Sequence, residues 1–473
     1  MRNTGIVCLL AALAGAGCST QDDEYVPTGA PDETDSYGEG GKEDSAAPGP
    51  DVPLAQQSGD IGQFFMVDHY GVNEAGFADI RQKIKTKNLG SIILWNPTGA
   101  SGETLRTMIR GYSEVAKAAG RDELFYAADH EELRTIRFTS ANGFTSLVQG
   151  SVLGSAGSNR DRLCELHARI TARELASTGM NMALGTVSDI YTSDSGTRGM
   201  FRTRAIDDEP NVVGGCITSM ANAYAQEGGV VFITKHFPGL GNASGNTDVD
   251  ASVATRSRTK VAMERELSPY RAASQAVSGG NAWALFGAMI SHASYPVIDG
   301  GKLPATLSSK IVTDLVRGDA GTQLSLGGKD SGGASTTFAG MNLRGLLVSD
   351  AFWTWGAIRG LAAVERQRLM ARAFLAGNDI LMIAKTDFTG AWGYFQEVYA
   401  NMLPAAEQQA LMAATGYTSW DELRAKFKAR IIESVTRIRA VKGILGPATS
   451  RMGTGPARNA SGALPAEYRT LSN

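Results

Sequence analysis

Charged and polar side chains recur at one kind of position in this sequence, directly after short apolar runs. The groups are Asp129-His130-Glu131, Lys235-His236, Ser291-His292 and Ser349-Asp350. Carboxylates beside Lys and His side chains could supply a nucleophile, a general acid or base, and cations that bind hydroxyl groups. A single His on a buried strand is more often structural, but four groups in the same position favour an active site.

Eight apolar runs could position these groups. Continuous runs of this kind are typical of parallel strands buried on both faces, and amphipathic stretches such as 163–170 separate them. The runs cover residues 64–67, 91–95, 124–129, 180–185, 230–237, 285–292, 345–350 and 379–384. Strands that alternate with helices over about 330 residues predict an α/β fold of the (β/α)8, or TIM-barrel, class. In such a barrel the carboxyl ends of the strands carry the active site.

Four further segments surround this pattern. A polar insertion at 318–342 predicts an extra surface loop or a small hairpin, and Ser308 is expected to cap a helix before it. After Lys385, residues 403–414 and 420–441 predict helices packed on the barrel. We expect residues 449–473 to form an extended or mobile tail.

The run Lys235-His236-Phe237-Pro238-Gly239 resembles the K-H-F-P-G motif of family 3 glycoside hydrolases, in particular their β-N-acetylglucosaminidase branch. Other segments resemble motifs of this family in the same order along the chain. They are 62–66, Asp129 to Arg134, 181–190 with Asp189 on the motif's aspartate, 204–210, 292–299, 303–308 and 345–358. The resemblance covers roughly residues 60 to 390, and its ordered series of motifs is more specific than any one of them.

The resemblance implies roles for several residues. Asp350 falls on the aspartate that serves the family as nucleophile, and retaining glycosidases need such a carboxylate to form a glycosyl-enzyme intermediate. The sugar is expected to be held by Asp129, Arg204, Lys235, His236 and His292. Positive charge near Asp350 would keep it ionised, as a nucleophile requires.

One position departs from the family pattern. The branch takes its acid/base from a histidine shortly after K-H-F-P-G, and Ser252 stands at that position here. A serine hydroxyl holds its proton too tightly to act as a general acid near neutral pH. The neighbour of Asp350 also differs, because Ala351 replaces an aspartate.

Three hypotheses remain for the missing acid. Asp248 or Asp250 could act if the pocket raises its pKa. An acid could instead come from the 318–342 insertion, which contains Asp319 and Asp330. Alternatively, the site could bind sugar with little catalysis.

We therefore expect a retaining, exo-acting β-glycosidase, similar to β-N-acetylhexosaminidases, that removes terminal sugars from glycans or cell-wall fragments. The alternative is a catalytically impaired carbohydrate-binding envelope lipoprotein on the same barrel. Trp353 and Trp355 could stack on sugar rings, although packing is the safer interpretation. We expect no metal and no organic cofactor, because this chemistry uses only carboxylates and water.

The N-terminus is typical of an exported protein. Arg2 precedes a short apolar stretch at 6–16, which is too short to span a bilayer, and small residues lead to Cys18. This resembles a bacterial lipoprotein processing site over residues 1–18, with an ordinary cleaved signal as the alternative. Residues 19–58 predict a disordered tether. With a lipid on Cys18, this tether would hold the folded domain at the cell envelope.

The remaining composition sets limits. Residues 59–448 should form the barrel domain with its C-terminal helices. The net charge of −3 and the absence of basic clusters speak against a nucleic-acid partner. Cys164 and Cys216 could pair in an oxidising compartment or could be two buried apolar residues, and no Cys/His spacing suggests zinc.

Overall fold

The computed structural model describes residues 54–71, 74–96, 100–131, 137–191, 201 and 203–472. Its centre is a parallel sheet of eight strands, as the apolar runs predict. The strands are β1 Phe65–Tyr70, β2 Ser91–Asn96, β3 Phe125–Asp129, β4 Met182–Val187, β5 Val231–Phe237, β6 Phe286–Ile290, β9 Leu347–Ser349 and β10 Leu381–Ile383. Strands β3, β4 and β5 are buried along their whole length, which explains why they read as unbroken apolar runs.

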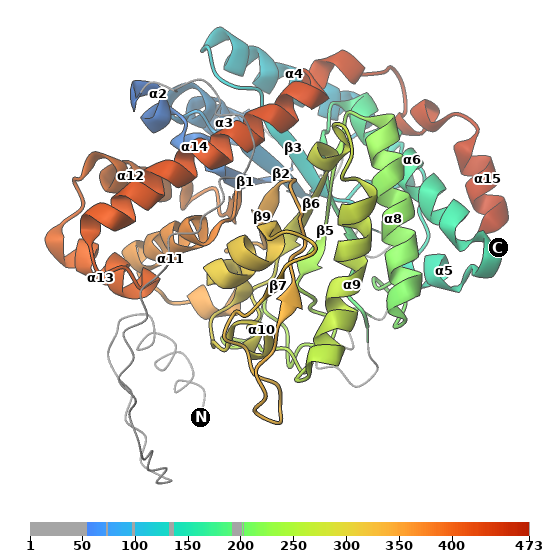
Figure 1. The fold of residues 1–473 in the computed structure, drawn as a ribbon. Helices are drawn as coiled ribbons and strands as arrows, with labels where there is room; N and C mark the ends of the chain where they lie inside the picture. Colours follow the sequence, from blue (N-terminus) through green and yellow to red (C-terminus); the bar gives the residue numbers. More distant parts are fainter. Residues whose placement is uncertain are drawn as a thin grey trace.

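The sheet closes into a barrel. Its strand order is β10-β1-β2-β3-β4-β5-β6-β9, and the two ends meet through the parallel bridge between Val348 and Ile380. The Ser349 backbone N–H also donates to the Ile380 carbonyl, at 2.9 Å. Figure 1 shows the strands at the centre with helices around them. The (β/α)8 prediction is therefore confirmed.

Helices cover the outside of the barrel. The main ones are α3 Glu74–Lys87, α4 Gly102–Ala118, α6 Arg160–Thr178, α8 Pro210–Glu227, α9 Lys260–Ala276, α11 Ala363–Ala376, α12 Phe388–Ala400, α13 Ala405–Thr415 and α14 Trp420–Leu445. Shorter ones are α2 Leu54–Gly59, α5 Gly150–Ser155, α10 Pro296–Asp299 and α15 Leu464–Leu471. Several begin at a side-chain cap, as where Ser101 accepts from the Thr104 N–H at the start of α4. Within the described residues, none of these helices has the length and apolar character needed to cross a membrane.

Helix α14 fastens the last strand. Asp379, just before β10, is fully buried, and three arginines surround its carboxylate. Arg317 Nη2 lies 2.8 Å from Oδ2, and Arg437 Nη1 and Arg430 Nη2 of α14 lie 2.6 and 3.6 Å from Oδ1. Burial alone would raise the pKa of Asp379, but Arg437, Arg317 and Arg430 outweigh it and lower that pKa. The expected helices after the barrel are thus tied to it by buried charges.

The insertion between β6 and β9 contains the small hairpin that was predicted as one possibility. Its strands β7 Gln323–Leu324 and β8 Phe338–Ala339 are antiparallel. A helix does run through Ile311 and Leu315, as a π-helical turn η6 Lys310–Leu315, but the predicted cap at Ser308 is wrong. The Ser308 hydroxyl donates to Asp299 Oδ2 at 2.6 Å, so the neighbouring α10 segment takes up the group that could have capped the helix.

The C-terminal segment contradicts the prediction of an extended or mobile tail. It contains the 3-10 turn η9 Ala457–Ser461 and helix α15, and Tyr468 of α15 is fully buried. Figure 1 shows α15 beside α5 and α6, far from α14, which precedes it in sequence. The predicted tether at 19–58 overlaps α2, whose Ser58 carbonyl accepts from Gln396 Nε2 of α12 at 2.6 Å. The rest of the tether lies outside the described residues, as do the predicted signal segment and Cys18.

Cys164 and Cys216 form a disulfide between α6 and α8, with a Cα–Cα distance of 5.4 Å. The sequence left two interpretations of these cysteines open, and the structure shows the disulfide.

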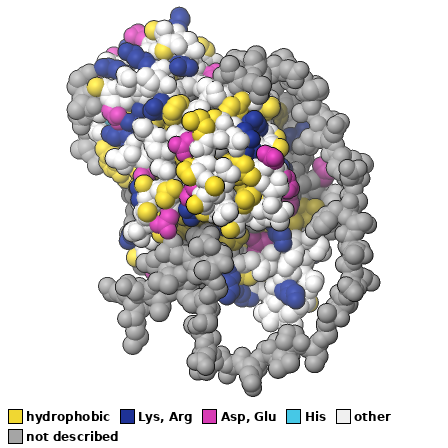
Figure 2. Space-filling view, turned by 90° about the vertical axis from the view of Figure 1, so that its left-hand side faces the viewer, with side chains coloured by type: hydrophobic (Ala, Val, Ile, Leu, Met, Phe, Trp, Pro, Cys, Tyr) yellow, Lys and Arg dark blue, Asp and Glu magenta, His cyan; other side chains and the backbone are white. Residues whose placement is uncertain are grey.

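On the face drawn in Figure 2, basic and acidic side chains are interspersed among apolar and uncharged ones, with no stretch of a single sign.

Candidate active site

A cavity of about 200 Å³ lies at the carboxyl ends of the barrel strands. Its lining combines carboxylates, cations and a few apolar side chains. These residues are Trp95, Asp129, Glu131, Arg137, Arg204, Lys235, His236, Leu240, Thr247, Asp248, Met289, Asp350, Ala351, Thr354 and Met382. The lining draws on β2, β3, β5, β6, β9 and β10 or the segments directly after them, as expected for a barrel active site.

Asp350 follows β9 directly and lies in this cavity. Its backbone N–H donates to the Ile290 carbonyl at 3.0 Å, and its Oδ1 accepts from the Ala351 N–H at 2.8 Å. Burial alone would raise the pKa of Asp350, but His236, His292, the Ala351 N–H and Lys235 together lower it. Asp350 is therefore held as a carboxylate, the form that a nucleophile needs.

Asp248 lies in the same cavity, on the loop after β5. Burial and the negative charge of Asp350 raise the pKa of Asp248, and a hydrogen bond with Thr354 only partly offsets them. The loop is held in place by hydrogen bonds from the Asp248 N–H to Asn246 Oδ1, at 2.9 Å, and from the Gly356 N–H to the Thr247 carbonyl, at 2.8 Å. The two aspartates thus have pKa values displaced in opposite directions, which is how paired carboxylates divide acid and nucleophile roles.

Asp250 has a different position. It is exposed and does not line the cavity, and its Oδ2 accepts from the Asn246 N–H at 2.9 Å. Its carboxylate therefore braces the loop that carries Asp248. Ser252, at the position of the family's histidine, is also exposed.

Buried ion pairs position the cations of the site. Lys235 Nζ lies 2.7 Å from Asp129 Oδ1 and 2.5 Å from Glu131 Oε1, and Arg204 binds both oxygens of Glu131 at 2.8 and 2.9 Å. Burial alone would raise the pKa of Glu131, but Arg204 and Lys235 lower it to about 2. Glu131 is fully buried, so it acts as the common anchor of both cations.

His236 is oriented by Asp189. The ring Nδ1 lies 2.7 Å from Asp189 Oδ2, and the carboxylate also accepts from the backbone N–H groups of His236 and Leu240. Asp189 has no exposed surface, and the ring of Phe201 packs edge-on against the imidazole. Because Nδ1 is occupied, Nε2 is the nitrogen that can meet a ligand.

An aromatic and a cation line another part of the cavity. The Arg137 guanidinium lies 4.6 Å from the ring centre of Trp95, and its Nη2 lies 3.2 Å from Asp129 Oδ2. Trp353, which is not part of the cavity lining, packs against Trp95 with the rings nearly perpendicular and the ring centres 5.2 Å apart. Trp95, rather than Trp353, therefore presents an aromatic surface to the cavity.

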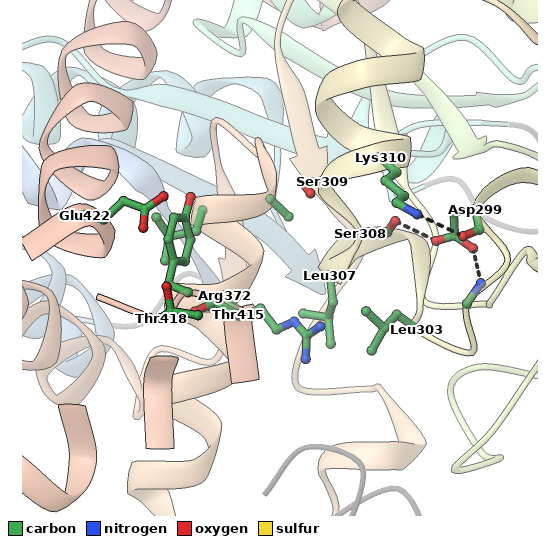
Figure 3. A pocket seen from close by; sticks show the side chains of 15 residues that line it. Asp299, Leu303, Leu307, Ser308, Ser309, Lys310, Arg372, Thr415, Thr418 and Glu422 are labelled. Atoms are coloured by element: carbon green, nitrogen blue, oxygen red, sulfur yellow. Dashed lines mark hydrogen bonds between the residues drawn. The ribbon is translucent and has the colours of Figure 1, made fainter. Parts of the chain in front are cut away.

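A larger cavity of about 450 Å³ lies elsewhere, between the α10–η6 region and helices α11, α13 and α14. Figure 3 shows Glu422 and Asp299 on opposite sides of it, with Arg372 between them. The Asp299 carboxylate accepts from the Ser308 hydroxyl and the Gly301 N–H, while Glu422 is exposed. This cavity is larger, but the paired Asp248 and Asp350 and the carboxyl ends of the strands lie in the smaller one.

The model of the glycosyl hydrolase family 3 N-terminal domain matches residues 58–408, which is most of the described barrel. The chain is a family 3 glycoside hydrolase. It therefore acts on O-glycosyl bonds, and the cavity at the strand ends is its candidate active site.

The hydrolase is similar to named proteins along most of its length. It is 25% identical to a β-hexosaminidase of Neisseria gonorrhoeae (strain NCCP11945) over 390 residues, which cover 78% of this chain and 92% of that protein. The β-N-acetylhexosaminidase structure from Beutenbergia cavernae superimposes with a TM-score of 0.63 at 21% identity, covering 83% of this chain and 99% of that one. The Neisseria gonorrhoeae enzyme in complex with N-trifluoroacetyl-D-glucosamine gives a TM-score of 0.52 at 22% identity, covering 78% and 98%. The two structural similarities bear on the fold alone.

Most residues that the sequence singles out meet in the hydrolase cavity. Those brought together are Asp129, Arg204, Lys235, His236, Asp248 and Asp350. His292, expected to contact substrate, is buried outside the cavity lining, where its Nδ1 lies 2.9 Å from Thr306 Oγ1 and its ring stacks on Trp355. Trp355 is thus a packing residue. Asp319 and Asp330 of the insertion do not line the cavity either, and Asp330 Oδ1 accepts the N–H groups of its own turn.

The sequence did not assign roles to four residues that matter here. Glu131 and Asp189 lay within recognised motifs, but only their partners in space give them a function. Trp95 ends the second apolar run, a position that could have marked it as a strand-end residue. Arg137 lies eight positions after Asp129 in the sequence, and the arginine noted there, Arg134, lies outside the described residues. In the part of the chain that the structure describes, no three His, Cys, Asp or Glu side chains gather as metal ligands.

Proposed function

We propose that the hydrolase is a retaining, exo-acting β-glycosidase in which Asp350 is the nucleophile and Asp248 the general acid and base. The observation that carries this proposal is the pair of carboxylates in one cavity, with the pKa of Asp248 raised and that of Asp350 lowered. A cavity of about 200 Å³ suits one terminal sugar better than a continuous chain.

The reaction would proceed in two steps. In the first, an Asp350 oxygen forms a bond to the anomeric carbon, the glycosidic C–O bond breaks, and Asp248 gives its proton to the departing oxygen. In the second, the ionised Asp248 takes a proton from water, whose oxygen bonds to the anomeric carbon and releases Asp350. Asp248 thereby regains its proton, and the bond is hydrolysed with retention.

Lys235, His236, Arg204 and Asp129 are positioned to hold the sugar hydroxyls. Lys235 and Arg204 are cations fixed by buried carboxylates, so their N–H groups face the cavity in a defined direction. The positive charge of Lys235 also stabilises ionised Asp350. The similarity to β-hexosaminidases over 92% of a relative's length supports a terminal N-acetyl-β-hexosaminide, in glycans or cell-wall fragments, as the substrate.

Trapping the intermediate tests the nucleophile. The protein would be incubated with a panel of aryl β-glycosides, including the N-acetylglucosaminide, and with a slow fluorinated glycoside. We expect turnover of the N-acetylglucosaminide and a mass increase on the peptide that contains Asp350, both lost in Asp350→Asn. Sugar binding without turnover or labelling would reject the hydrolase mechanism and favour the impaired carbohydrate-binding alternative.

Leaving groups test the acid. In Asp248→Asn we expect rates on substrates with poor leaving groups to fall by about 10²- to 10⁴-fold, the usual contribution of a general acid, with a much smaller loss on activated aryl glycosides. Asp250→Asn is the matched control, because it removes an equivalent carboxylate from the same loop but outside the cavity. A leaving-group-dependent loss in Asp250→Asn alone would assign the acid to Asp250 instead.

We also propose that the protein is exported and anchored at the cell envelope through a lipid on Cys18. The apolar stretch before Cys18 supports this, and so does the Cys164–Cys216 disulfide, since disulfides persist mainly in oxidising compartments. Labelling with a radioactive fatty acid followed by membrane fractionation tests it. We expect label and membrane association in the wild type and neither in Cys18→Ala, whereas unlabelled protein in the soluble fraction would indicate ordinary secretion.

A further inference from the structure

The C-terminal segment reaches the active site through a chain of buried hydrogen bonds. Tyr468 of α15 lies with its hydroxyl 3.0 Å from His167 Nδ1, on α6. His167 Nε2 lies 3.1 Å from the backbone carbonyl of Glu131. Glu131 anchors Lys235 and Arg204, as described above. Tyr468 and Glu131 have no exposed surface and His167 is 2% exposed, so water does not compete for these bonds.

The direction of each hydrogen bond follows from the groups involved. A carbonyl can only accept, so His167 Nε2 carries a hydrogen and donates to Glu131. Burial lowers the pKa of His167 to about 4, so the ring is neutral near pH 7 and Nδ1 is an acceptor. The Tyr468 hydroxyl therefore donates to Nδ1, and its oxygen accepts from the Val148 N–H at 3.1 Å. Every group in the chain has a partner in a single arrangement.

Glu131 is confined on its other side as well. A Cβ atom at Gly185 would lie 2.5 Å from Glu131 Cγ, so the Glu131 side chain packs directly on the β4 backbone. Arg204 and Lys235 bind its carboxylate and His167 binds its carbonyl. A shift of the Glu131 backbone would therefore move both cations that face the sugar.

Further hydrogen bonds and an ion pair hold the C-terminal segment on the barrel. The Ser461 hydroxyl donates to Glu174 Oε1 of α6 at 2.7 Å, inside the protein. The Arg458 N–H donates to the Gly143 carbonyl at 2.9 Å, and Arg106 Nη2 to the Gly455 carbonyl at 2.7 Å. At the surface, Arg162 binds both carboxylate oxygens of Glu467.

We propose that the segment 453–471 is a positioning element for the sugar site, acting through Tyr468 and His167 on Glu131 and thereby on Lys235 and Arg204. This inference rests on the proposed role of the two cations in binding sugar. Tyr468 and His167 touch no substrate and are positioning residues. The C-terminal helix is then part of the catalytic architecture, although it lies on the outer wall of the barrel (Figure 1).

The test compares Tyr468→Phe with Glu467→Gln. Both change α15, but Tyr468→Phe removes the hydroxyl that donates to His167 and accepts from the Val148 N–H, whereas Glu467→Gln weakens a surface contact with α6. In Tyr468→Phe we expect kcat/KM to fall about 10-fold, within the range that a misplacement of about 1 Å can cause, with weaker binding of N-acetylglucosamine. Glu467→Gln should stay within about 2-fold of the wild type. All measurements are made far below each variant's Tm.

A second pair of variants separates positioning from stability. In His167→Gln the amide can still donate to the Glu131 carbonyl, whereas in His167→Leu no donor remains. We expect His167→Gln to recover most of the kcat/KM that His167→Leu loses. Variants with lower Tm but unchanged kcat/KM and sugar affinity would overturn the inference while leaving the proposed function intact. A wild type that neither turns over nor binds sugar would reject the proposed function, and this inference with it.

Discussion

Asp248 and Asp350 face the same cavity but differ in what surrounds them. Two imidazoles, a backbone N–H and Lys235 stabilise the charge on Asp350. Asp248 has Asp350 as its main charged neighbour and is half-buried. Like charges that share a small volume cannot both ionise cheaply, so the proton stays on the less stabilised carboxylate. Asp248 can therefore hold the proton of the general acid without a histidine in that role.

The two pKa directions predict an acidic activity optimum. Asp350 must be ionised, so on the acidic side kcat/KM should fall when the pH drops below the lowered pKa of Asp350. Asp248 must be protonated, so kcat/KM should fall as the pH rises through the raised pKa of Asp248. In Asp248→Asn the alkaline limb should disappear on an activated aryl glycoside, while the acidic limb remains. An alkaline limb that persists in this variant would show that another group supplies the proton.

The sequence could identify the carboxylate loop but not the carboxylate. Asp248 and Asp250 are two positions apart in an irregular segment, where no periodicity tells which side chain faces inward. The structure separates them because Asp250 turns back to the Asn246 N–H. The sequence also could not show that His292 Nδ1 lies 2.9 Å from Thr306 Oγ1, so its expected contact with substrate stays a prediction.

At the scale of elements, the acid loop rests on the short turn η7 Gly356–Ile358, which follows β9. The Gly356 N–H donates to the Thr247 carbonyl, and a Cβ atom at Gly356 would lie 2.7 Å from backbone atoms of Val249 and Asp250. The segment after β9 therefore fixes the position of the loop that carries Asp248.

A methyl group at Gly356 should displace that loop. In Gly356→Ala we expect kcat/KM on substrates with poor leaving groups to fall about 10-fold or more, because the acid moves away from the departing oxygen. Labelling of Asp350 by an activated fluoroglycoside should continue. The matched control is Gly393→Ala in α12, where a Cβ atom meets nothing within 4 Å. Equal losses on good and poor leaving groups would argue against a specific effect on the acid.

The strands were predictable because strands that are buried on both faces consist of consecutive apolar residues. Each apolar run coincides with a barrel strand, with ends that differ by a few residues. The C-terminal segment was not predictable in this way. It contacts the barrel through a few residues such as Tyr468 and Ser461, separated by Gly, Pro and polar residues that resemble a loop. The predicted helix cap at Ser308 was wrong for a local reason, because the Ser308 hydroxyl donates to Asp299 and is not available to the helix.

At the scale of the whole molecule, the disulfide joins two neighbouring outer helices across 52 residues of sequence. The chain between the cysteines includes β4 and the Asp189 that orients His236. Cross-linking a loop of this length restricts the unfolded chain and stabilises the folded one by about 4 kcal/mol in the chain-entropy description.

The double variant Cys164→Ser/Cys216→Ser should therefore unfold at lower denaturant concentration than the wild type. We expect a loss of up to about 4 kcal/mol in the free energy of unfolding, measured by urea titration. A reducing agent should destabilise the wild type and leave the double variant unchanged. Thiol labelling of Cys164 and Cys216 in the unfolded, unreduced wild type, located by peptide mapping, would contradict the cross-link.

The buried Asp379 cluster has a consequence for biosynthesis. The chain leaves the ribosome from its N-terminus, so all eight barrel strands are made before Arg430 and Arg437 of α14 exist. Until then Arg317 is the one arginine of the cluster beside the Asp379 carboxylate, which also accepts from the Leu347 N–H, and a buried ion cluster that lacks a partner costs about 3–5 kcal/mol. A chain that stops at residue 408, where the family match ends, should fail to show cooperative unfolding, and cooperative unfolding of that fragment would refute this expectation. In the nascent chain all barrel strands are therefore present about fifty residues before the arginines that complete the Asp379 cluster are synthesised.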